Sequence, residues 1–496
     1  ESADGARGGR LDSLWVGLVA LALYVALGQD TLYGVDAWND LRLLAGGDVR
    51  SAVHVLYRPL AAWFADLGGV FGWSLHESVR MLSAVGAALG VAFMHAASRR
   101  LLVAPSAAFV QGIWIAVLPG IWFYGTVAER HGPFFAFAGV ACYVTACWIR
   151  SGRTVWTLGF ALACGLAYAA HSTGVLLCGM LVPLYAMERH RAGRPWLRDS
   201  LVALLGSAVA VFAVSRLAFL AGQLTEATGN LQILGEYAGV ALQHVDHWPN
   251  VAWHEFLLPL MPVSLVWLGR VRGPDGLCVT TTLAVGVAVY LMFSILILAG
   301  FDAIEHFDER GAYALPLAWP LTRVSAAVLG RRLALVGIGL SSVIAVAQIL
   351  VHDTHRDQWT RPEAELLRQV EPGRPPYLLP AVRPDFELLF VEFPEFRPWF
   401  PEPGRDGDYI DLFHAVHAED HDGGKAIAAI LPNLLRAIVT TGRPVLISER
   451  AVRFLETSEH RDVSVLGPEF LAELRRAFEF REVGDATHRY YRLEPR

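Results

Sequence analysis

Long apolar segments recur through the first 350 residues of this chain, and they constrain its fold more than any other feature. The first is LWVGLVALALYVALG at residues 14–28. A helix of about 20 apolar residues crosses the hydrocarbon core of a bilayer. The segments therefore predict a polytopic α-helical membrane protein with about 11 transmembrane helices, near residues 13–29, 78–97, 101–122, 133–149, 155–170, 173–187, 200–221, 251–269, 277–299, 313–329 and 333–351.

The composition supports this class. The chain is 54% hydrophobic and 18% charged, and its mean hydropathy of +0.40 excludes an ordinary soluble protein. The apolar piece at 59–74 is short and contains several glycines, so it is expected to be an interfacial or re-entrant segment. All five cysteines fall inside apolar segments, and none forms a CxxC pair, so neither a disulfide framework nor a cysteine metal site is expected.

The arginines predict the orientation. If the N-terminus is cytoplasmic, each short loop after an even-numbered span should be basic. All five such loops are basic, with Arg99 and Arg100, Arg150 and Arg153, Arg189 to Arg198, Arg270 and Arg272, and Arg331 and Arg332. We therefore expect an integral protein of a bacterial inner membrane whose outer face carries the loops 30–60, 123–132, 170–173, 222–250 and 300–312.

The composition changes near residue 353, so we divide the chain into a membrane domain, 1–352, and a C-terminal domain, 353–496. The second is charged and contains no predicted span. PPYLLPAV, RPVLIS and HRYYRLE are typical of strands, whereas KAIAAILPNLLRAIVTTG and LGPEFLAELRRAFEF are typical of amphipathic helices, the second starting at Pro468. This alternation predicts a small extracytoplasmic α/β soluble domain.

Charged and polar residues gather at the predicted outer ends of the spans. Such charges are costly near a membrane and tend to face a cavity or one another. The alternative is a set of ordinary loop charges, some of them paired as salt bridges. The candidates from the loop 30–60 are Asp36, Asp40, His54, Tyr57 and Arg58, and those from later loops and span ends are Glu129, Arg130, His171, Arg216, Glu309, Arg310 and Tyr313.

A carboxylate beside several arginines suits one kind of reaction. Arginine binds phosphate through a bidentate fork and keeps its proton, and a carboxylate can accept a proton as a general base. Together they suit attack by an acceptor hydroxyl on a sugar whose leaving group is a lipid-borne phosphate. Arg58, Arg310 and either Arg130 or Arg216 are expected to hold that phosphate. Motifs for dinucleotide binding, phosphate-binding loops and zinc proteases are absent from the sequence.

The remaining candidates have less specific roles. Asp40, His54, His171 and Glu309 are candidate substrate-binding residues. Tyr57 and Tyr313 are also substrate-binding candidates, but they fit an aromatic belt at the membrane interface better. No cofactor is predicted, and nothing in the sequence indicates a divalent metal.

Three short motifs resemble those of a known family. VDAWND…YRPLAAWF after the first span resembles the first outer loop of the GT-C glycosyltransferases, and YRPL is similar to a motif of the transmembrane O-mannosyltransferases that act on cadherins and of their bacterial relatives. TVAERHGPFFAF and DERGAYALPL resemble later segments of the same group. The resemblance implies a GT-C fold, an inverting transfer of a mannose-like sugar from a polyprenyl-monophosphate donor, and Asp36 as the catalytic base, with Glu129 positioning the acceptor or pairing with an arginine.

The chain departs from that group in places. Asp36 is followed by Ala37 where paired acids are common, and Gly311 and Ala312 stand where bulkier residues are usual. The acceptor could be a protein, a glycan or a lipid, whereas no nucleic-acid partner is expected. Three alternatives stay open at this point: an O-antigen-ligase-like or polymerase-like enzyme, a transporter or flippase of lipid-linked substrates, and a structural or assembly protein.

Overall fold

The computed structural model describes the chain in separate stretches, namely residues 3–29, 37, 40–41, 43–44, 47–50, 54–101, 104–220, 248–270, 311–355, 377–379, 432–433, 435–457, 468–484 and 489–496. The predicted span 277–299 lies outside them, as do Asp36, Glu309 and Arg310. The chain divides into two compact units. One contains residues 1–30 and 48–351, and the other contains 31–47 and 352–496.

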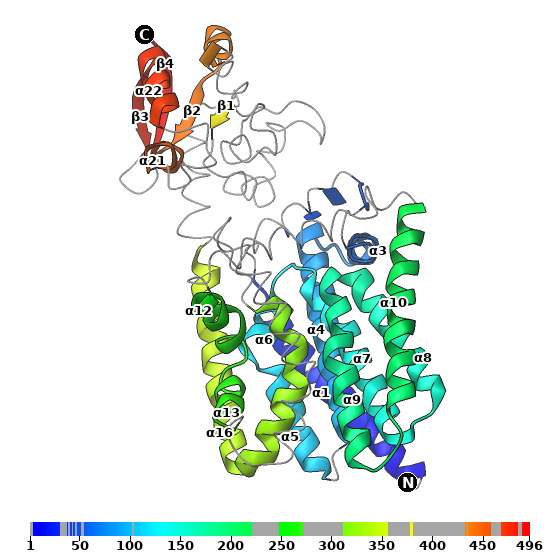
Figure 1. Cartoon of the computed structure of the whole chain (residues 1–496). Coiled ribbons are helices and arrows are strands. Elements are labelled where there is room, and N and C mark those ends of the chain that lie inside the picture. Colours follow the sequence, from blue (N-terminus) through cyan, green and yellow to red (C-terminus); the bar gives the residue numbers. More distant parts are fainter. Residues whose placement is uncertain are drawn as a thin grey trace. The chain divides into compact units, whose positions relative to one another are not determined.

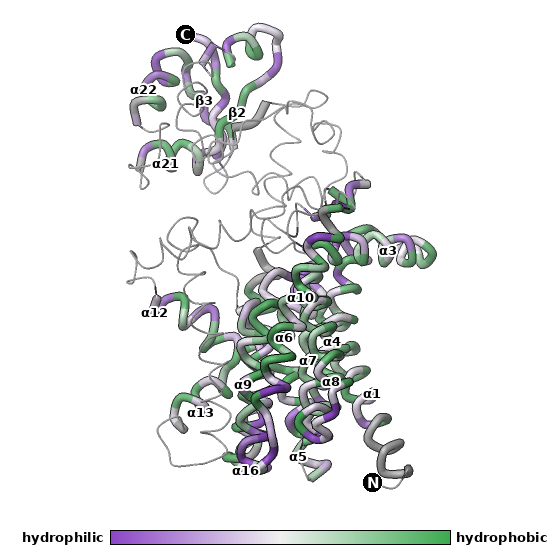
Figure 2. The backbone as a smooth tube through the Cα atoms, turned by 45° about the vertical axis from the view of Figure 1, so that its right-hand side comes forward, coloured by the Kyte–Doolittle hydropathy of each residue, from purple (hydrophilic) through white to green (hydrophobic). Residues whose placement is uncertain are grey.

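The first unit is a bundle of helices that are joined mostly by short turns (Figure 1). The long helices run between the two ends of the bundle. They are α1 (Ala3–Ala26), α4 (Leu75–Leu101), α7 (His131–Ser151), α8 (Thr154–Ala170), α9 (Leu176–Arg191), α10 (Leu197–Leu220) and α16 (Ala318–His355). Of these, α4 and α7 run in the same direction, side by side. The helix α3 (Tyr57–Val70) lies across one end of the bundle instead, which agrees with the interfacial placement predicted for 59–74 (Figures 1 and 2).

Several of these helices could cross a membrane. In the part of the chain that the structure describes, four helices are long and apolar enough, namely Leu75–Leu101, His131–Ser151, Leu197–Leu217 and Val328–Val351. Two more, Leu11–Ala26 and Thr154–Ala170, are apolar but shorter. The described residues are thus mainly helical with several apolar helices, as predicted. They contain four such spans, or five if the bent pair described next is one span, so the predicted number of eleven is not confirmed.

Proline explains where two predicted spans differ from the structure. The predicted span 101–122 is a pair of helices, α5 (Pro105–Ala116) and α6 (Pro119–Thr126), bent by 57°. Pro119 has no N–H to donate and disfavours a helical conformation at the preceding residue, so the helix stops before it. The predicted span 251–269 is likewise broken, with Pro259 and Pro262 between its two helical parts. These parts are α12 (Trp248–Val251), which a π-helical segment extends to Leu257, and α13 (Val263–Arg270).

A further break falls where the sequence predicts one. The predicted spans 313–329 and 333–351 correspond to the 3-10 segment η4 (Ala312–Leu317) followed by α16. Gly330 has a non-helical backbone inside α16, with φ 67° and ψ 172°. Positive φ is accessible to glycine at little cost, so Gly330 separates the two predicted segments.

The outward faces of the bundle are apolar. On α10, Leu205, Val209 and Phe212 are exposed, and the hydrophobic colour continues along most of the bundle helices in Figure 2. Exposed contiguous apolar surface of this extent marks contact with a membrane or a partner. The exposed apolar surface of these helices is therefore what is expected of helices that face lipid.

Close packing of α4 against α7 fixes the region that follows α6. A Cβ atom built at Gly86 would lie 2.6 Å from the carbonyl carbon and oxygen of Gly132, and one built at Gly132 would lie 2.4 Å from the carbonyl oxygen of Ser83. Only residues without a side chain allow two helix backbones to approach so closely. The start of α7 is therefore held directly against the third turn of α4.

The predicted inner loops meet at the opposite end of the bundle from α3. The guanidinium of Arg150 donates to the carbonyl oxygen of Arg100 at 3.0 Å, and that of Arg194 donates to the carbonyl oxygen of Arg150 at 3.3 Å. Arg99 lies 3.6 Å from the carboxylate of Asp12. Loops that are separate in the sequence thus form one basic end.

The second unit contains a four-stranded sheet with strand order β1-β2-β4-β3. Its strands are β1 (Tyr377–Leu379), β2 (Val445–Ser448), β3 (Phe478–Gly484) and β4 (Arg489–Pro495). β1 pairs with β2 in parallel, and the other pairs are antiparallel. Two helices, α21 (Glu449–Thr457) and α22 (Pro468–Ala477), contribute apolar residues such as Leu455, Leu471 and Leu474 to the core of the sheet.

The secondary structure predicted for this region is partly confirmed. All three predicted strands are present, and α22 starts at Pro468 as expected. The prediction that this helix continues through Phe480 is wrong, because Phe478–Gly484 forms β3 and pairs with β4. Hydrogen bonds to a neighbouring strand outweigh the weak local preference of this segment for helix.

Candidate functional site

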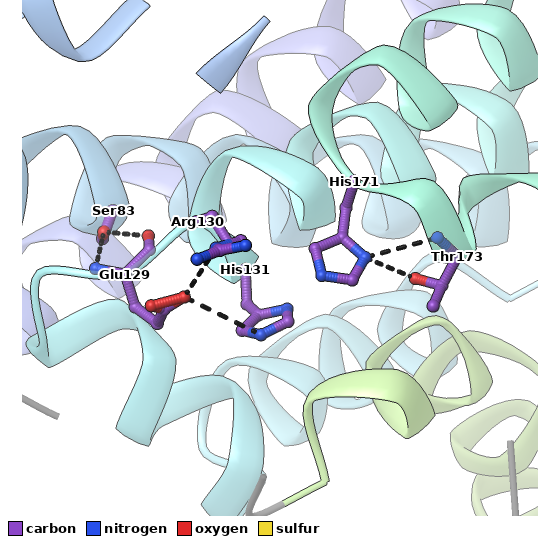
Figure 3. A network of polar contacts seen from close by, with 6 residues as sticks. All are labelled: Ser83, Glu129, Arg130, His131, His171 and Thr173. Carbon is purple, nitrogen blue, oxygen red and sulfur yellow. Dashed lines mark hydrogen bonds and ion pairs between the residues drawn. The ribbon is translucent and has the colours of Figure 1, made fainter. Parts of the chain in front are cut away.

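A cluster of buried polar side chains lies at the bundle end that carries α3. Figure 3 shows its centre, which combines Ser83 of α4, the turn Glu129–Arg130 with His131 at the start of α7, and the turn His171–Thr173 between α8 and α9. All six residues are buried, and Arg130 and Thr173, at 8%, are the most exposed of them. Buried polar groups are costly unless they are paired, so the contacts within the cluster decide what it can do.

The carboxylate of Glu129 is held by two neighbours. Its Oε1 lies 3.3 Å from Nε of Arg130 and 3.9 Å from Nε2 of His131. The side chains of Glu129 and Arg130 are only 6% and 9% exposed, so the charge of each is balanced by the other away from bulk water. This arrangement agrees with the predicted pairing of Glu129 with an arginine.

The backbone of Glu129 is fixed by Ser83. The hydroxyl of Ser83 donates to the carbonyl oxygen of Glu129 at 2.6 Å, and the amide of Glu129 donates back to the same Oγ at 3.0 Å (Figure 3). Both backbone groups are thereby satisfied by one side chain of α4. The turn that carries Glu129 and Arg130 is therefore fixed in position before any ligand arrives.

Three histidines form a column of rings beside this turn. His54 stacks on His171 with a centroid distance of 4.3 Å and an interplanar angle of 17°, and His131 lies 4.6 Å from His171 on a tilted plane. Tyr124 packs edge-on against His131 at 4.8 Å, and the ring of Tyr313 lies 5.7 Å from that of His171. Residues from four separate segments of the chain thus meet at one place.

The histidines outside the helices are uncharged at neutral pH. Burial lowers the pKa of His54 well below its ordinary value, and the positive charge of Arg130 lowers it further. Burial also lowers the pKa of the His171 imidazole, with added effects of His131 and Arg130. Neutral imidazoles can donate one hydrogen bond and accept another, so they add polarity to the site without adding charge.

The loop that carries Asp36 begins next to this cluster. Gln29, just after α1, is bonded to Thr126 at the end of α6. Its backbone amide donates to the carbonyl oxygen of Thr126 at 2.8 Å, and its side-chain amide donates to the Thr126 hydroxyl at 2.7 Å. Thr126 precedes Glu129 by three residues. The start of the first outer loop is therefore fixed beside the Glu129 turn.

The structure brings together five of the residues chosen from the sequence, namely Glu129, Arg130, His54, His171 and Tyr313. Asp40 is buried, and it belongs to the second unit. Asp36, Glu309 and Arg310 lie outside the described residues.

Two predicted arginines have other surroundings. Arg216 is exposed on α10, where its guanidinium lies 5.2 Å from the centre of the Phe212 ring. Arg58 is half-buried at the start of α3 and donates a hydrogen bond to the carbonyl oxygen of Arg50. Arg58 also acts on the histidine column as a positive charge, since it lowers the pKa of His54.

The aromatic-belt interpretation fails for both tyrosines. Tyr57 is 1% exposed, so its ring is inside the protein and cannot face the membrane interface. Tyr313 packs against His131 and His171, with centroid distances of 6.1 and 5.7 Å. Tyr57 is therefore an interior residue, and the half-buried Tyr313 borders the site.

Three residues of the cluster were not predicted from the sequence. His131 directly follows Glu129 and Arg130 in the motif AERHG, so its neighbours were a signal that could have revealed it. Ser83 and Thr173 had no such signal, because a serine in an apolar helix and a threonine in a turn are common. No group of three or more His, Cys, Asp or Glu side chains able to hold a metal ion occurs among the residues that the structure describes.

A match to a protein family includes most of this site. Residues 57–219 match the family model described as dolichyl-phosphate-mannose-protein mannosyltransferase. The resemblance to the GT-C glycosyltransferases is confirmed. The matched segment contains the Glu129 turn, His131 and His171, whereas His54 lies three residues before it and Tyr313 lies beyond it.

Solved GT-C structures are similar to the chain at low identity. ArnT from Cupriavidus metallidurans in the apo state is 13% identical with a TM-score of 0.44, and the match covers 99% of this chain and 98% of ArnT. The Archaeoglobus fulgidus oligosaccharyltransferase in complex with Zn and sulfate is 11% identical with a TM-score of 0.46, covering 97% and 72% of the two chains. The same archaeal enzyme, AglB, with an inhibitory peptide and a dolichol-phosphate is 13% identical with a TM-score of 0.42, covering 97% and 74%. No curated protein matches the sequence.

Proposed function

We propose that this chain is a membrane glycosyltransferase that transfers a mannose-like sugar from a polyprenyl-monophosphate carrier to an acceptor hydroxyl. One observation carries the proposal: the segment that matches the mannosyltransferase family contains a buried, mutually paired Glu129, Arg130 and His131 beside the neutral His171. Buried charges are retained where they serve a function or are well paired. A carboxylate, a guanidinium and imidazoles in one place are the groups that acid–base chemistry on a phosphate-linked sugar requires.

The proposed reaction is a single displacement. The acceptor oxygen forms a bond to the anomeric carbon while the bond from that carbon to the phosphate oxygen breaks, and the configuration inverts. The proton of the acceptor hydroxyl passes to the carboxylate of Asp36, and the electron pair of the broken bond stays on the departing lipid phosphate. Arginines on the leaving-group side stabilise that growing charge. Arg130 is one of them in this proposal, together with Arg58 and Arg310.

Glu129 has a supporting role in this scheme. Its carboxylate already contacts Arg130 and His131, so it orients these two side chains rather than accepting the proton. Asp36 remains the proposed base because its loop starts at Gln29, which is bonded beside the Glu129 turn.

The same proposal includes the placement of the chain. The N-terminus and the basic end of the bundle lie in the cytoplasm, and the site and the domain 353–496 lie on the outer face of a bacterial inner membrane. The positive-inside rule supports this orientation, together with the contacts that join Arg100, Arg150 and Arg194 at one end.

The test is direct transfer by the purified protein. It is incubated with polyprenyl-phosphate mannose and with other polyprenyl-phosphate sugars, and donor consumption and the anomeric configuration of the product are measured. Asp36→Asn should lower turnover by about 10²- to 10⁴-fold with donor affinity almost unchanged, and Arg310→Ala should weaken donor binding about tenfold or more.

A matched control is Asp66→Asn, a change of the same type at an exposed position of α3, and it should leave turnover unchanged. If Asp36→Asn stays active while Glu129→Gln is inactive, Glu129 is the base instead. If no polyprenyl-phosphate sugar is consumed, or if both variants keep full activity, the proposal is wrong.

A further inference from the structure

The turn that carries His171 has a defined backbone. His171 ends α8 with an extended conformation, φ −153° and ψ 134°, and its amide donates to the carbonyl oxygen of Ala167 at 2.9 Å. Gly174 closes the turn by donating to the carbonyl oxygen of His171 at 2.8 Å. A Cβ at Gly174 would lie 2.3 Å from the backbone nitrogen of Tyr168, so only glycine fits. The backbone at His171 is therefore fixed, and so is the direction in which its side chain leaves the chain.

Thr173 decides which ring nitrogen of His171 carries the proton. The amide of Thr173 donates to Nδ1 at 3.3 Å, and the Thr173 hydroxyl lies 2.8 Å from the same atom. The amide hydrogen of Thr173 needs an acceptor at Nδ1, and the hydroxyl can donate to the same atom, so we assign Nδ1 as the acceptor. Because a neutral imidazole has one N–H, the proton is on Nε2.

The rings around His171 prevent it from turning. His54 covers one face at 4.3 Å in a nearly parallel stack, and Phe134 lies 5.4 Å from the ring. Figure 3 shows that the ring nitrogen not bonded to Thr173 is on the side of His131, away from Thr173. The Nε2–H group is thus oriented toward the Glu129–Arg130 turn.

The charges near this group favour an anion. The carboxylate of Glu129 balances the charge of Arg130. Arg58 is a further positive charge near the histidines, since it also lowers the pKa of His54. An N–H donor in an electropositive surrounding is suited to an anionic oxygen.

We infer that His171 binds an oxygen of the donor lipid phosphate as a neutral Nε2–H donor, and that Thr173 and His54 are positioning residues that hold this tautomer and orientation. The inference rests on the proposed function. It adds a second type of donor to the arginines: a neutral group with a fixed direction, which binds phosphate without increasing the net charge of a buried site.

The test uses two substitutions that differ in the position of one N–H donor. In His171→Gln the amide nitrogen can occupy the position of Nε2, whereas in His171→Asn it can reach only the position of Nδ1. Binding of polyprenyl-phosphate mannose to the purified protein in nanodiscs should be within about threefold of wild type for His171→Gln and at least about tenfold weaker for His171→Asn. Thermal unfolding of both variants checks that the fold is kept.

Thr173 is tested with a readout that a purely structural role would not change. In protein labelled with ¹⁵N-histidine, the difference between wild type and His171→Gln identifies the His171 signals, which should show a protonated Nε2 and an unprotonated Nδ1. Thr173→Val keeps the amide that donates to Nδ1 and removes only the hydroxyl contact. It should therefore reduce, but not abolish, the preference for the tautomer with a protonated Nε2 and weaken donor binding, and Thr173→Ser, which keeps the hydroxyl, should restore both.

The experiments distinguish failure of this inference from failure of the proposed function. If wild type binds donor but the Gln and Asn variants bind it equally well, or if His171 carries its proton on Nδ1, this inference is overturned and the proposed function stands. If wild type binds no polyprenyl-phosphate sugar, both are overturned.

Discussion

Ser83 and Glu129 form a reciprocal pair between α4 and the turn before α7. The Ser83 hydroxyl donates to the Glu129 carbonyl oxygen at 2.6 Å and accepts from the Glu129 amide at 3.0 Å. Both residues are buried, at 0% and 4% exposure. One side chain therefore satisfies a backbone donor and a backbone acceptor that water cannot reach, at the residue whose carboxylate holds Arg130 and His131.

Replacing Ser83 should impair the site more than the fold around it. Ser83→Ala leaves the buried N–H and C=O of Glu129 without this partner, at a cost of about 1–3 kcal/mol. We expect a lower thermal unfolding midpoint and at least about tenfold lower sugar transfer. The control is Ser78→Ala on the same helix, whose hydroxyl donates to the carbonyl oxygen of Ser74 in the preceding turn. Equal activities of the two variants would show that the pair does not position Glu129.

The close approach of α4 and α7 should not tolerate an added methyl group. Gly86→Ala places a Cβ 2.6 Å from backbone atoms of Gly132, and backbone can yield only if the helices separate. Overpacking of this kind costs about 1–3 kcal/mol. Chemical denaturation in detergent should show this loss. Gly69→Ala on α3 is the control, because no described atom lies within 4 Å of its Cβ. Its stability should equal or slightly exceed that of wild type, since alanine favours a helix more than glycine does.

Stability should fall as the pH is lowered below about 6.5. The pKa values of His54 and His171 are depressed in the folded protein, mainly by burial. In the unfolded chain these rings bind protons below their ordinary pKa of about 6.5, so the unfolded state gains protons that the folded state excludes. The stabilisation is fully present above that pH. It is lost at about 1.4 kcal/mol per pH unit for each ring as the pH falls toward the folded values.

Unfolding midpoints of wild type and His171→Gln between pH 7.5 and 5 measure this effect. The variant should show a shallower decline, because one of the two rings is gone. Parallel curves for the two proteins would mean that His171 titrates normally in the folded state.

The orientation can be read from two introduced cysteines. Ala192 lies exposed in the turn after α9 at the basic end, and Asp66 is exposed on α3 at the end that carries the site. In intact cells a membrane-impermeant thiol reagent should label Asp66→Cys and spare Ala192→Cys, since basic loops stay in the cytoplasm. Lysis should expose Ala192→Cys. The reverse pattern would place the site in the cytoplasm and contradict the proposed function.

The sequence alone determined the membrane class of the chain and most of its helix positions. Hydrophobicity is a local property, so a run of apolar residues such as 197–220 indicates a helix wherever it packs. Pro119 and Gly330 are local as well, and each marks an interruption because of its own backbone. The motif AERHG also indicated a site by its composition, and the family match includes it.

Tertiary structure decided which of these residues meet. His54, His131 and His171 come from three separate parts of the chain, and only the packing of the bundle helices brings their rings together. Ser83 became part of the site because Gly86 and Gly132 allow α4 and α7 to touch, and Phe478–Gly484 became a strand because β4 lies beside it. Each of these outcomes depends on contacts between distant segments. Their free energy is gained only when the chain is folded, so no local pattern in the sequence could reveal them.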